Sequence, residues 1–248
     1  MKKIIASQVV MFDYDETIVT KHLHSIIGMF INQNSLASIQ KKEELTVFDH
    51  SSNEIIENMP LLNYAKLLRN ESKILFNENV MEKLLEALND DNKKVAIVTK
   101  NAYPDVAYQL LVDELVNKYS VSLNQIHDQL KVIGGVVHSH IGKMGHVLTA
   151  LVAFNAIETD NLSKDNFTEI FNDVYLYEND KHNLEVASFY GMHPILIENN
   201  GDLNEKPVLS SAFIRDYGSA DLWELLHPED IDLIGNPPPS PEYDNDIS

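Results

Sequence analysis

Short apolar runs recur along the chain, and each of them stops at a polar or acidic residue. The runs are rich in β-branched side chains and too short for helices, which is typical of strands buried on both faces of a parallel sheet. From this pattern we predict strands at residues 8–12, 95–98, 132–137, 174–177 and 194–197.

Amphipathic stretches alternate with these runs. In residues 79–88, for example, Val80, Leu84 and Leu88 lie on one helical face. Helices are also predicted at residues 106–119, 144–154 and 184–190. Strands that alternate with helices imply right-handed crossovers and a parallel sheet covered on both faces. Ligands of such folds bind beyond the carboxyl ends of the strands, so we expect the chemistry just after residues 12, 98 and 177.

Two segments fall outside this rhythm. Residues 18–76 carry helical patterns at 25–34 and 54–68 with one weak extended piece at 45–48. Residues 235–248 are acidic and proline-rich and have no apolar periodicity, so we expect a disordered tail there. We therefore predict a core of residues 1–17 and 77–234 and an inserted segment of residues 18–76.

Composition and charge narrow the possible partners. The 248 residues are 44% hydrophobic, and 19 basic against 38 acidic side chains give a formal net charge of −19. Such a charge disfavours binding to nucleic acids or to anionic membrane surfaces. The sequence shows neither a membrane-spanning apolar run nor the apolar stretch of a signal peptide. It contains no cysteine, which excludes a thiol nucleophile, and we expect a cytoplasmic protein.

Two aspartates follow the first predicted strand, in the segment Asp13-Tyr14-Asp15-Glu16-Thr17. One carboxylate of such a pair can attack phosphorus while the other donates and accepts a proton, and together they can hold a hard cation such as Mg²⁺. A calcium loop of the EF-hand type does not fit, because Ile18 stands where that loop requires glycine. A solvated acidic turn is the alternative interpretation.

Further candidates follow the other strands. Thr99 ends the second strand, and its hydroxyl can bind a phosphoryl oxygen. Lys143 stands at the start of a helix, where a cation can neutralise a carboxylate and a phosphoryl group together. The segment 178–183, which includes Glu178, Asn179 and Asp180, supplies oxygen donors for a metal.

Taken in order, these segments resemble the four motifs of the haloacid dehalogenase (HAD) superfamily, in its DxDxT phosphatase branch. Residues 10–17 resemble the first motif, 96–99 the second, Lys143 the third and 177–192 the fourth. The resemblance implies a three-layer, Rossmann-like α/β core with a parallel sheet, and a small, mainly helical cap of the C1 type inserted at residues 18–76.

The resemblance also implies roles for individual residues. Asp13 would be the nucleophile that forms an aspartyl-phosphate, and Asp15 the general acid and base. Thr99 and Lys143 would hold the transferring phosphoryl group. Mg²⁺ would bind the Asp13 side chain, the backbone carbonyl of Asp15 and a side chain of the fourth motif.

The fourth motif departs from its commonest form, because asparagines stand at positions 179 and 183 where acids are usual. We take Asn179 as the direct metal ligand, with Glu178 or Asp180 supplying charge through water. The second aspartate, Asp15, argues against dehalogenation.

These expectations point to a Mg²⁺-dependent phosphatase that hydrolyses a phosphomonoester. The substrate is either a phosphoprotein side chain or a small phosphorylated metabolite, and neither nucleic acid nor membrane is expected as a partner. A phosphotransferase that uses the same intermediate shares every motif. A catalytically silent binding protein of the same fold is the other alternative, since the two asparagines weaken the metal site.

Overall fold

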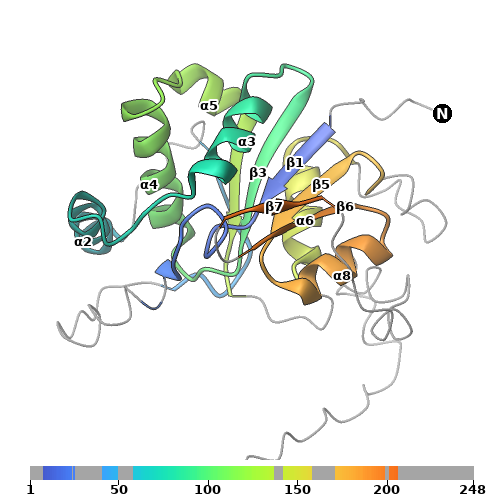
Figure 1. The fold of residues 1–248 in the computed structure, drawn as a ribbon, viewed down its shortest axis with the longest axis horizontal. Helices are drawn as coiled ribbons and strands as arrows, with labels where there is room; N and C mark the ends of the chain where they lie inside the picture. Colours follow the sequence, from blue (N-terminus) through green and yellow to red (C-terminus); the bar gives the residue numbers. More distant parts are fainter. Residues whose placement is uncertain are drawn as a thin grey trace, which may run out of the picture.

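The computed structural model describes residues 8–23, 25, 41–49, 58–136, 142–157, 171–198 and 201–205. In this part of the chain, a seven-stranded sheet is covered by helices on both faces (Figure 1). The strands are β1 (Gln8–Phe12), β2 (Thr46–Phe48), β3 (Lys93–Thr99), β4 (Leu130–Gly134), β5 (Val174–Glu178), β6 (His193–Ile197) and β7 (Leu203–Asn204). The helices are α2 (Met59–Asn70), α3 (Glu78–Leu88), α4 (Pro104–Asn117), α5 (Leu123–Gln129), α6 (Met144–Ala153) and α8 (Lys181–Phe189).

The strand order is β2-β4-β3-β1-β5-β6-β7. The five central strands, β4, β3, β1, β5 and β6, pair in parallel, which confirms the predicted sheet. β2 and β7 are antiparallel edge strands. From β1 the chain proceeds through β3 to β4, and it then returns to β5 on the other side of β1. The direction of winding therefore reverses at β1, and in open α/β sheets the ligand crevice lies at the carboxyl end of such a strand.

Alternating side chains of the central strands build two apolar clusters, one on each face of the sheet. In β1, Val10 and Phe12 face the cluster formed with α2, α3, α4 and α5, whereas Val9 and Met11 face the cluster formed with α6 and α8. Met11 and Phe12 are fully buried. A shift of one residue would exchange the two faces, so this burial specifies the register of the strand.

The two ends of the segment 18–76 lie side by side. The Thr20 amide donates to the Leu75 carbonyl at 2.9 Å, and the Asn77 amide donates to the Ile18 carbonyl at 2.8 Å. The chain therefore leaves the core and returns to it at one place, as an inserted segment must.

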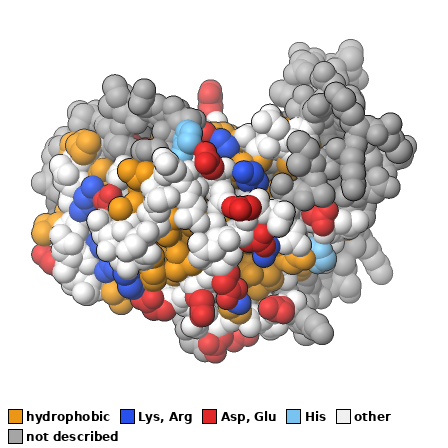
Figure 2. Space-filling view, turned by 90° about the horizontal axis from the view of Figure 1, so that it is seen from above, with side chains coloured by type: hydrophobic (Ala, Val, Ile, Leu, Met, Phe, Trp, Pro, Cys, Tyr) orange, Lys and Arg blue, Asp and Glu red, His pale blue; other side chains and the backbone are white. Residues whose placement is uncertain are grey.

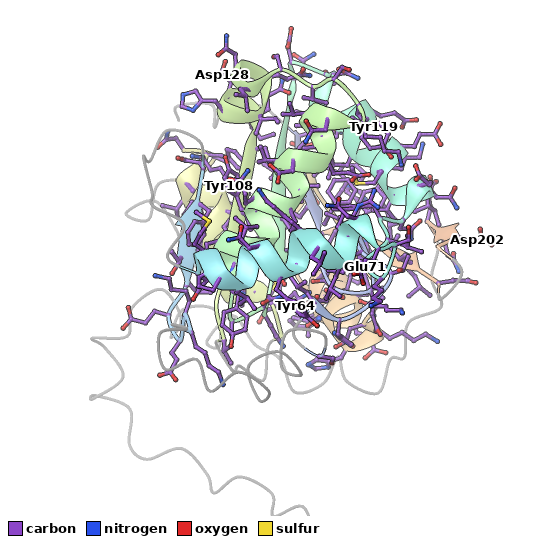
Figure 3. The ribbon with its side chains drawn as sticks, turned by 90° about the vertical axis from the view of Figure 1, so that its left-hand side faces the viewer. Tyr64, Glu71, Tyr108, Tyr119, Asp128 and Asp202 are labelled. Atoms are coloured by element: carbon purple, nitrogen blue, oxygen red, sulfur yellow. The ribbon has the colours of Figure 1, made fainter. Side chains whose placement is uncertain are left out.

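The described middle of that segment packs on the core. β2 pairs with β4 at the edge of the sheet. α2 packs across α4, and Figure 3 shows this contact from the side, with Tyr64 labelled on α2 and Tyr108 on α4. Arg69 of α2 donates to both carboxylate oxygens of Glu114 of α4, at 2.8–3.0 Å. The described middle of the inserted segment therefore packs against the core. A cap over the site stays a prediction, since residues 26–40 and 50–57 lie outside the described part.

The fourth strand is shorter than the predicted span of residues 132–137, because it ends at Gly134. A Cβ on Gly134 would lie 2.3 Å from the Cβ of Pro104, and Gly135 has a φ of +139° with the Glu44 carbonyl close by. Close backbone approach from the chain before β2 thus ends the strand. The helices α2, α3, α4, α6 and α8 correspond to those predicted at residues 54–68, 79–88, 106–119, 144–154 and 184–190, and α5 has no predicted counterpart. The helix predicted at residues 25–34 lies outside the described residues except for residue 25, and the predicted tail lies outside them entirely.

Figure 2 shows acidic, basic and apolar side chains interspersed over the described surface of one face. None of the helices that the structure describes is long and apolar enough to cross a membrane.

His146 of α6 gives the core a testable pH response. It is 1% exposed, its Nε2 lies 3.1 Å from the Gly135 carbonyl oxygen, and burial lowers its pKa to about 4. In the unfolded chain the histidine has a pKa of about 6.5, so between pH 6.5 and 4 the unfolded state binds a proton that the folded state does not. The contribution of neutral His146 to stability is therefore complete above about pH 6.5 and decreases as the pH falls through that window.

We expect His146→Gln to remove this response, since glutamine keeps a donor for Gly135 and does not titrate. Urea unfolding at several pH values from 7 to 4 measures this response. The free energy of unfolding should change less steeply with pH in the variant, by up to about 1.4 kcal/mol per pH unit, which corresponds to one proton. Parallel curves for the two proteins would contradict a neutral buried histidine.

Candidate active site

The crevice at the end of β1 contains Asp13, which directly follows the strand. Its backbone amide donates to the Tyr177 carbonyl at 2.9 Å, so the pairing with β5 continues one residue past the strand. The alternation of β1 places Asp13 on the same face as Met11, which is the face that α6 covers. The side chain is 5% exposed.

Lys143 lies between two buried carboxylates. It is the N-cap residue of α6, and its Nζ forms ion pairs with Asp13 and, at 2.8 Å, with Glu178 Oε2. Asp13 and Lys143 are each 5% exposed and Glu178 is fully buried. When all three groups are ionised the cluster carries one net negative charge, and unpaired buried charges of this kind are strongly unfavourable.

The pKa values of the cluster reflect this balance. Burial is the largest cause of the raised pKa of both Asp13 and Glu178, and Lys143 only partly offsets it. The charge of Asp15 raises the pKa of Asp13 further, and the charge of Asp13 raises the pKa of Glu178. Burial alone would lower the pKa of Lys143, but the charges of Asp13 and Glu178 outweigh it and raise that pKa. The lysine therefore stays charged, and the two carboxylates compete for it.

Glu178 is the last residue of β5, and its carboxylate is held on several sides. The backbone amides of Asn179 and Asp180 each donate to Oε1 at 3.1 Å, and Asn183 Nδ2 donates to Oε2 at 3.2 Å. The Oδ1 of Asn183 is buried and has no hydrogen-bond partner among the described residues. This network orients Glu178 toward Lys143.

Asp15 has a different environment from Asp13. It lies in the turn after β1, where Glu16 has a φ of +59° and the Val19 amide donates to the Tyr14 carbonyl at 3.0 Å. Its Oδ1 accepts from the Leu23 amide at 2.6 Å. Burial raises the pKa of Asp15, and the bond from Leu23 partly offsets that shift.

Thr99 ends β3 and is 1% exposed. Its Oγ1 accepts from the Asn101 amide at 3.2 Å, which leaves the hydroxyl hydrogen for a different acceptor. The Asn101 side chain reaches Asp15 Oδ2 at 3.2 Å. Sequence reasoning missed Asn101, although an Asn two residues after a strand and before Tyr103-Pro104 is typical of an Asx turn.

Asn179, the predicted metal ligand, begins the loop after β5. Its Oδ1 accepts from Thr17 Oγ1 at 3.4 Å, and its Nδ2 donates to Glu16 Oε2 at 3.2 Å. Asp180 caps α8, since its side chain accepts from the His182 amide at 2.9 Å. Of the two acids proposed to support Asn179, Glu178 therefore faces the Asp13–Lys143 pair, whereas Asp180 stabilises a helix end.

The donor set of this site fits a hard cation. It offers carboxylate oxygens of Asp13 and Glu178, the Asn179 amide and the backbone carbonyl of Asp15, around a cluster with net negative charge, and such oxygens are the ligands that Mg²⁺ prefers. Within the described ranges no three His, Asp or Glu side chains are already gathered around a metal position. The Asp15 carboxylate is directed instead to Leu23 and Asn101.

A hollow of about 490 Å³ opens beside the turn that carries Asp15. Glu16 and Thr20 of this turn line it, together with Phe76 and with residues at the start of α3. None of Asp13, Asp15, Thr99 and Lys143 is among the residues that line it.

A search of solved structures finds a likeness to an archaeal beta-phosphoglucomutase from the hyper-thermophilic Pyrococcus sp. strain ST 04. The match covers 89% of this chain and 99% of that chain, with 15% identity and a TM-score of 0.37. A scan of family models and a search of curated proteins find no match. Because the overlap is this loose, the interpretation of the site depends on the side chains described above.

The ligand set predicts how Mg²⁺ dependence responds to substitution. We expect Asn179→Asp to lower the Mg²⁺ concentration that gives half-maximal binding, because it adds a charge, and Asn179→Ala and Glu178→Gln to raise it roughly tenfold or more. Isothermal titration of each variant with Mg²⁺ measures this directly.

The matched control is Asp180→Ser, which keeps a residue able to cap α8 and removes only the carboxylate. Its Mg²⁺ affinity should equal that of the unchanged protein. If the Asn179 variants were unaltered and Asp180→Ser lost affinity, the ligand would be Asp180 instead.

Proposed function

We propose that the protein is a Mg²⁺-dependent phosphomonoesterase that forms an aspartyl-phosphate on Asp13. The observation that supports this most is the buried ion pair between Asp13 and Lys143, shared with Glu178, at the strand end where the winding of the sheet reverses. A lysine in this position keeps a buried carboxylate ionised, and it can also neutralise an incoming phosphoryl group.

In the first step, an Asp13 carboxylate oxygen attacks phosphorus in line with the leaving group. The bond from phosphorus to the ester oxygen breaks as the new bond forms, and Asp15 gives its proton to the departing alkoxide. Lys143 and the Thr99 hydroxyl bind the equatorial phosphoryl oxygens. Thr99 suits this role, because its oxygen accepts from the Asn101 amide and its hydrogen remains to be donated.

In the second step, water attacks the phosphorus of the aspartyl-phosphate. Asp15, now a carboxylate, accepts the proton of this water, the bond between phosphorus and Asp13 breaks, and inorganic phosphate leaves. Both side chains are then returned to their starting protonation states.

Mg²⁺, held by Asp13, Asn179 and the Asp15 carbonyl with Glu178 nearby, would offset negative charge as phosphate and carboxylate approach each other. Lys143 is already shared by two carboxylates, so a further cation would offset the negative charge that the phosphate group brings. A phosphorylated metabolite and a phosphoprotein side chain both remain candidate substrates.

Asp13→Asn should abolish turnover while the protein still folds. Asparagine is nearly isosteric, but its amide cannot act as the nucleophile, so phosphate release from p-nitrophenyl phosphate in Mg²⁺ should fall at least ~10³-fold. Asp113→Asn is the matched control, because Asp113 lies on α4 and pairs with Lys66 at 2.7 Å. A folded Asp13→Asn protein with the rate of Asp113→Asn would rule out the covalent mechanism.

Asp15→Asn should affect substrates according to their leaving groups. With an alkyl phosphate, whose leaving group needs a proton, we expect kcat to fall roughly 10²–10⁴-fold. With p-nitrophenyl phosphate, whose leaving group needs none, the loss should be smaller. Steady-state kinetics on the two esters measures this, and an unchanged kcat on the alkyl ester would remove Asp15 from the role of acid.

A further inference from the structure

Asn101 connects two parts of the proposed active site that are far apart in the sequence. It follows β3 by two residues and is 3% exposed. Its backbone amide donates to Thr99 Oγ1 at 3.2 Å, and its side-chain Nδ2 donates to Asp15 Oδ2 at 3.2 Å. Its Oδ1 accepts from the Tyr103 amide at 2.9 Å. Both ends of the amide are thus used, and the side chain has one orientation.

The Asp15 carboxylate is held at both oxygens by these contacts. Oδ1 accepts from the Leu23 backbone amide and Oδ2 from Asn101 Nδ2. Each oxygen keeps a second lone pair at which a proton can be carried. The two donors come from different places, since Leu23 lies in the inserted segment and Asn101 lies on the core turn that follows Thr99. Asn101 is therefore the contact that ties Asp15 to the residue proposed to hold the phosphoryl group.

We propose that Asn101 is a positioning residue, whose side-chain amide holds the Asp15 carboxylate in the orientation needed for proton transfer to the leaving group. This inference rests on the proposed phosphomonoesterase function. A general acid must lie within hydrogen-bond reach of the atom that it protonates, and a displacement of about 1 Å can cost on the order of 10²-fold in rate. The contact of Asn101 with Thr99 is made by its backbone amide, so a substitution of the side chain leaves that donor in place.

The test substitutes Asn101 by serine, which is too short to reach Asp15 but can still accept from the Tyr103 amide. We expect kcat/KM for an alkyl phosphate such as glycerol phosphate to fall roughly 10–100-fold, because that leaving group requires the proton. For p-nitrophenyl phosphate kcat/KM should change less than about threefold. This parameter reports the steps up to release of the alcohol, so it leaves out the later hydrolysis in which Asp15 acts as the base for both esters. If Asn101→Ser does not fold, Asn101→Thr, which also keeps an acceptor for the Tyr103 amide and is too short to reach Asp15, should show the same selectivity.

The matched control is Asn58→Ser. Asn58 is 1% exposed, and its Nδ2 also donates to a carboxylate, that of Asp105, at 3.2–3.3 Å. We expect this variant to lose stability without changing the ratio of the two rates. A double variant isolates the contact itself: in an Asp15→Asn background, Asn101→Ser should lower the alkyl-ester rate by less than about threefold.

Equal losses on both esters, no loss on either, or a full additional loss in the Asp15→Asn background would each overturn the positioning role. A failure of the proposed function gives a different result. In that case the unchanged protein, assayed with Mg²⁺, would release no phosphate from either ester and would match Asp13→Asn, and both proposals would fall together.

Discussion

The ion pairs of Lys143 with Asp13 and Glu178 are the constraint on which the site depends. All three groups are nearly or fully buried, and none of them is tolerable there as an isolated charge. Two carboxylates with raised pKa values share a single ammonium, so a proton or a further cation would offset the negative charge that the cluster carries when all three groups are ionised. We regard this charge arrangement as functional, since a core selected for stability alone would replace such a cluster by apolar side chains.

The sheet provides the geometry for this cluster through simple alternation. Asp13 continues the face of Met11, and Glu178 continues the face of Val174 and Leu176, so both carboxylates emerge on the side that α6 covers. Lys143 caps that helix and meets them there. The site is thus built from strand ends and a helix start, which are more rigid supports than loops.

The opposite side of the crevice belongs to the turn after β1 and the turn after β3. There the chain holds Asp15 between the Leu23 amide and Asn101, whereas Asp13 is paired with Lys143. The two aspartates of one short segment therefore have different partners, and different partners are what allow one to act as nucleophile and the other as acid and base.

The positions of the central strands along the chain, their burial and the candidates Asp13, Asp15, Thr99 and Lys143 were predictable from sequence, because alternation, run length and position at a strand end are local signals. Glu178 as the partner of Lys143 and Asn101 as the partner of Asp15 were not, since each contact joins segments separated widely in the chain. The packing of β2 and α2 on the core could not be predicted for the same reason. Their apolar positions show that a face is buried, but not which neighbouring element covers it. Sequence alone determined which residue types stand at the strand ends. Only the tertiary structure decided which of them share a lysine or a hydrogen bond, because pairing depends on distances in space that the order of residues does not specify.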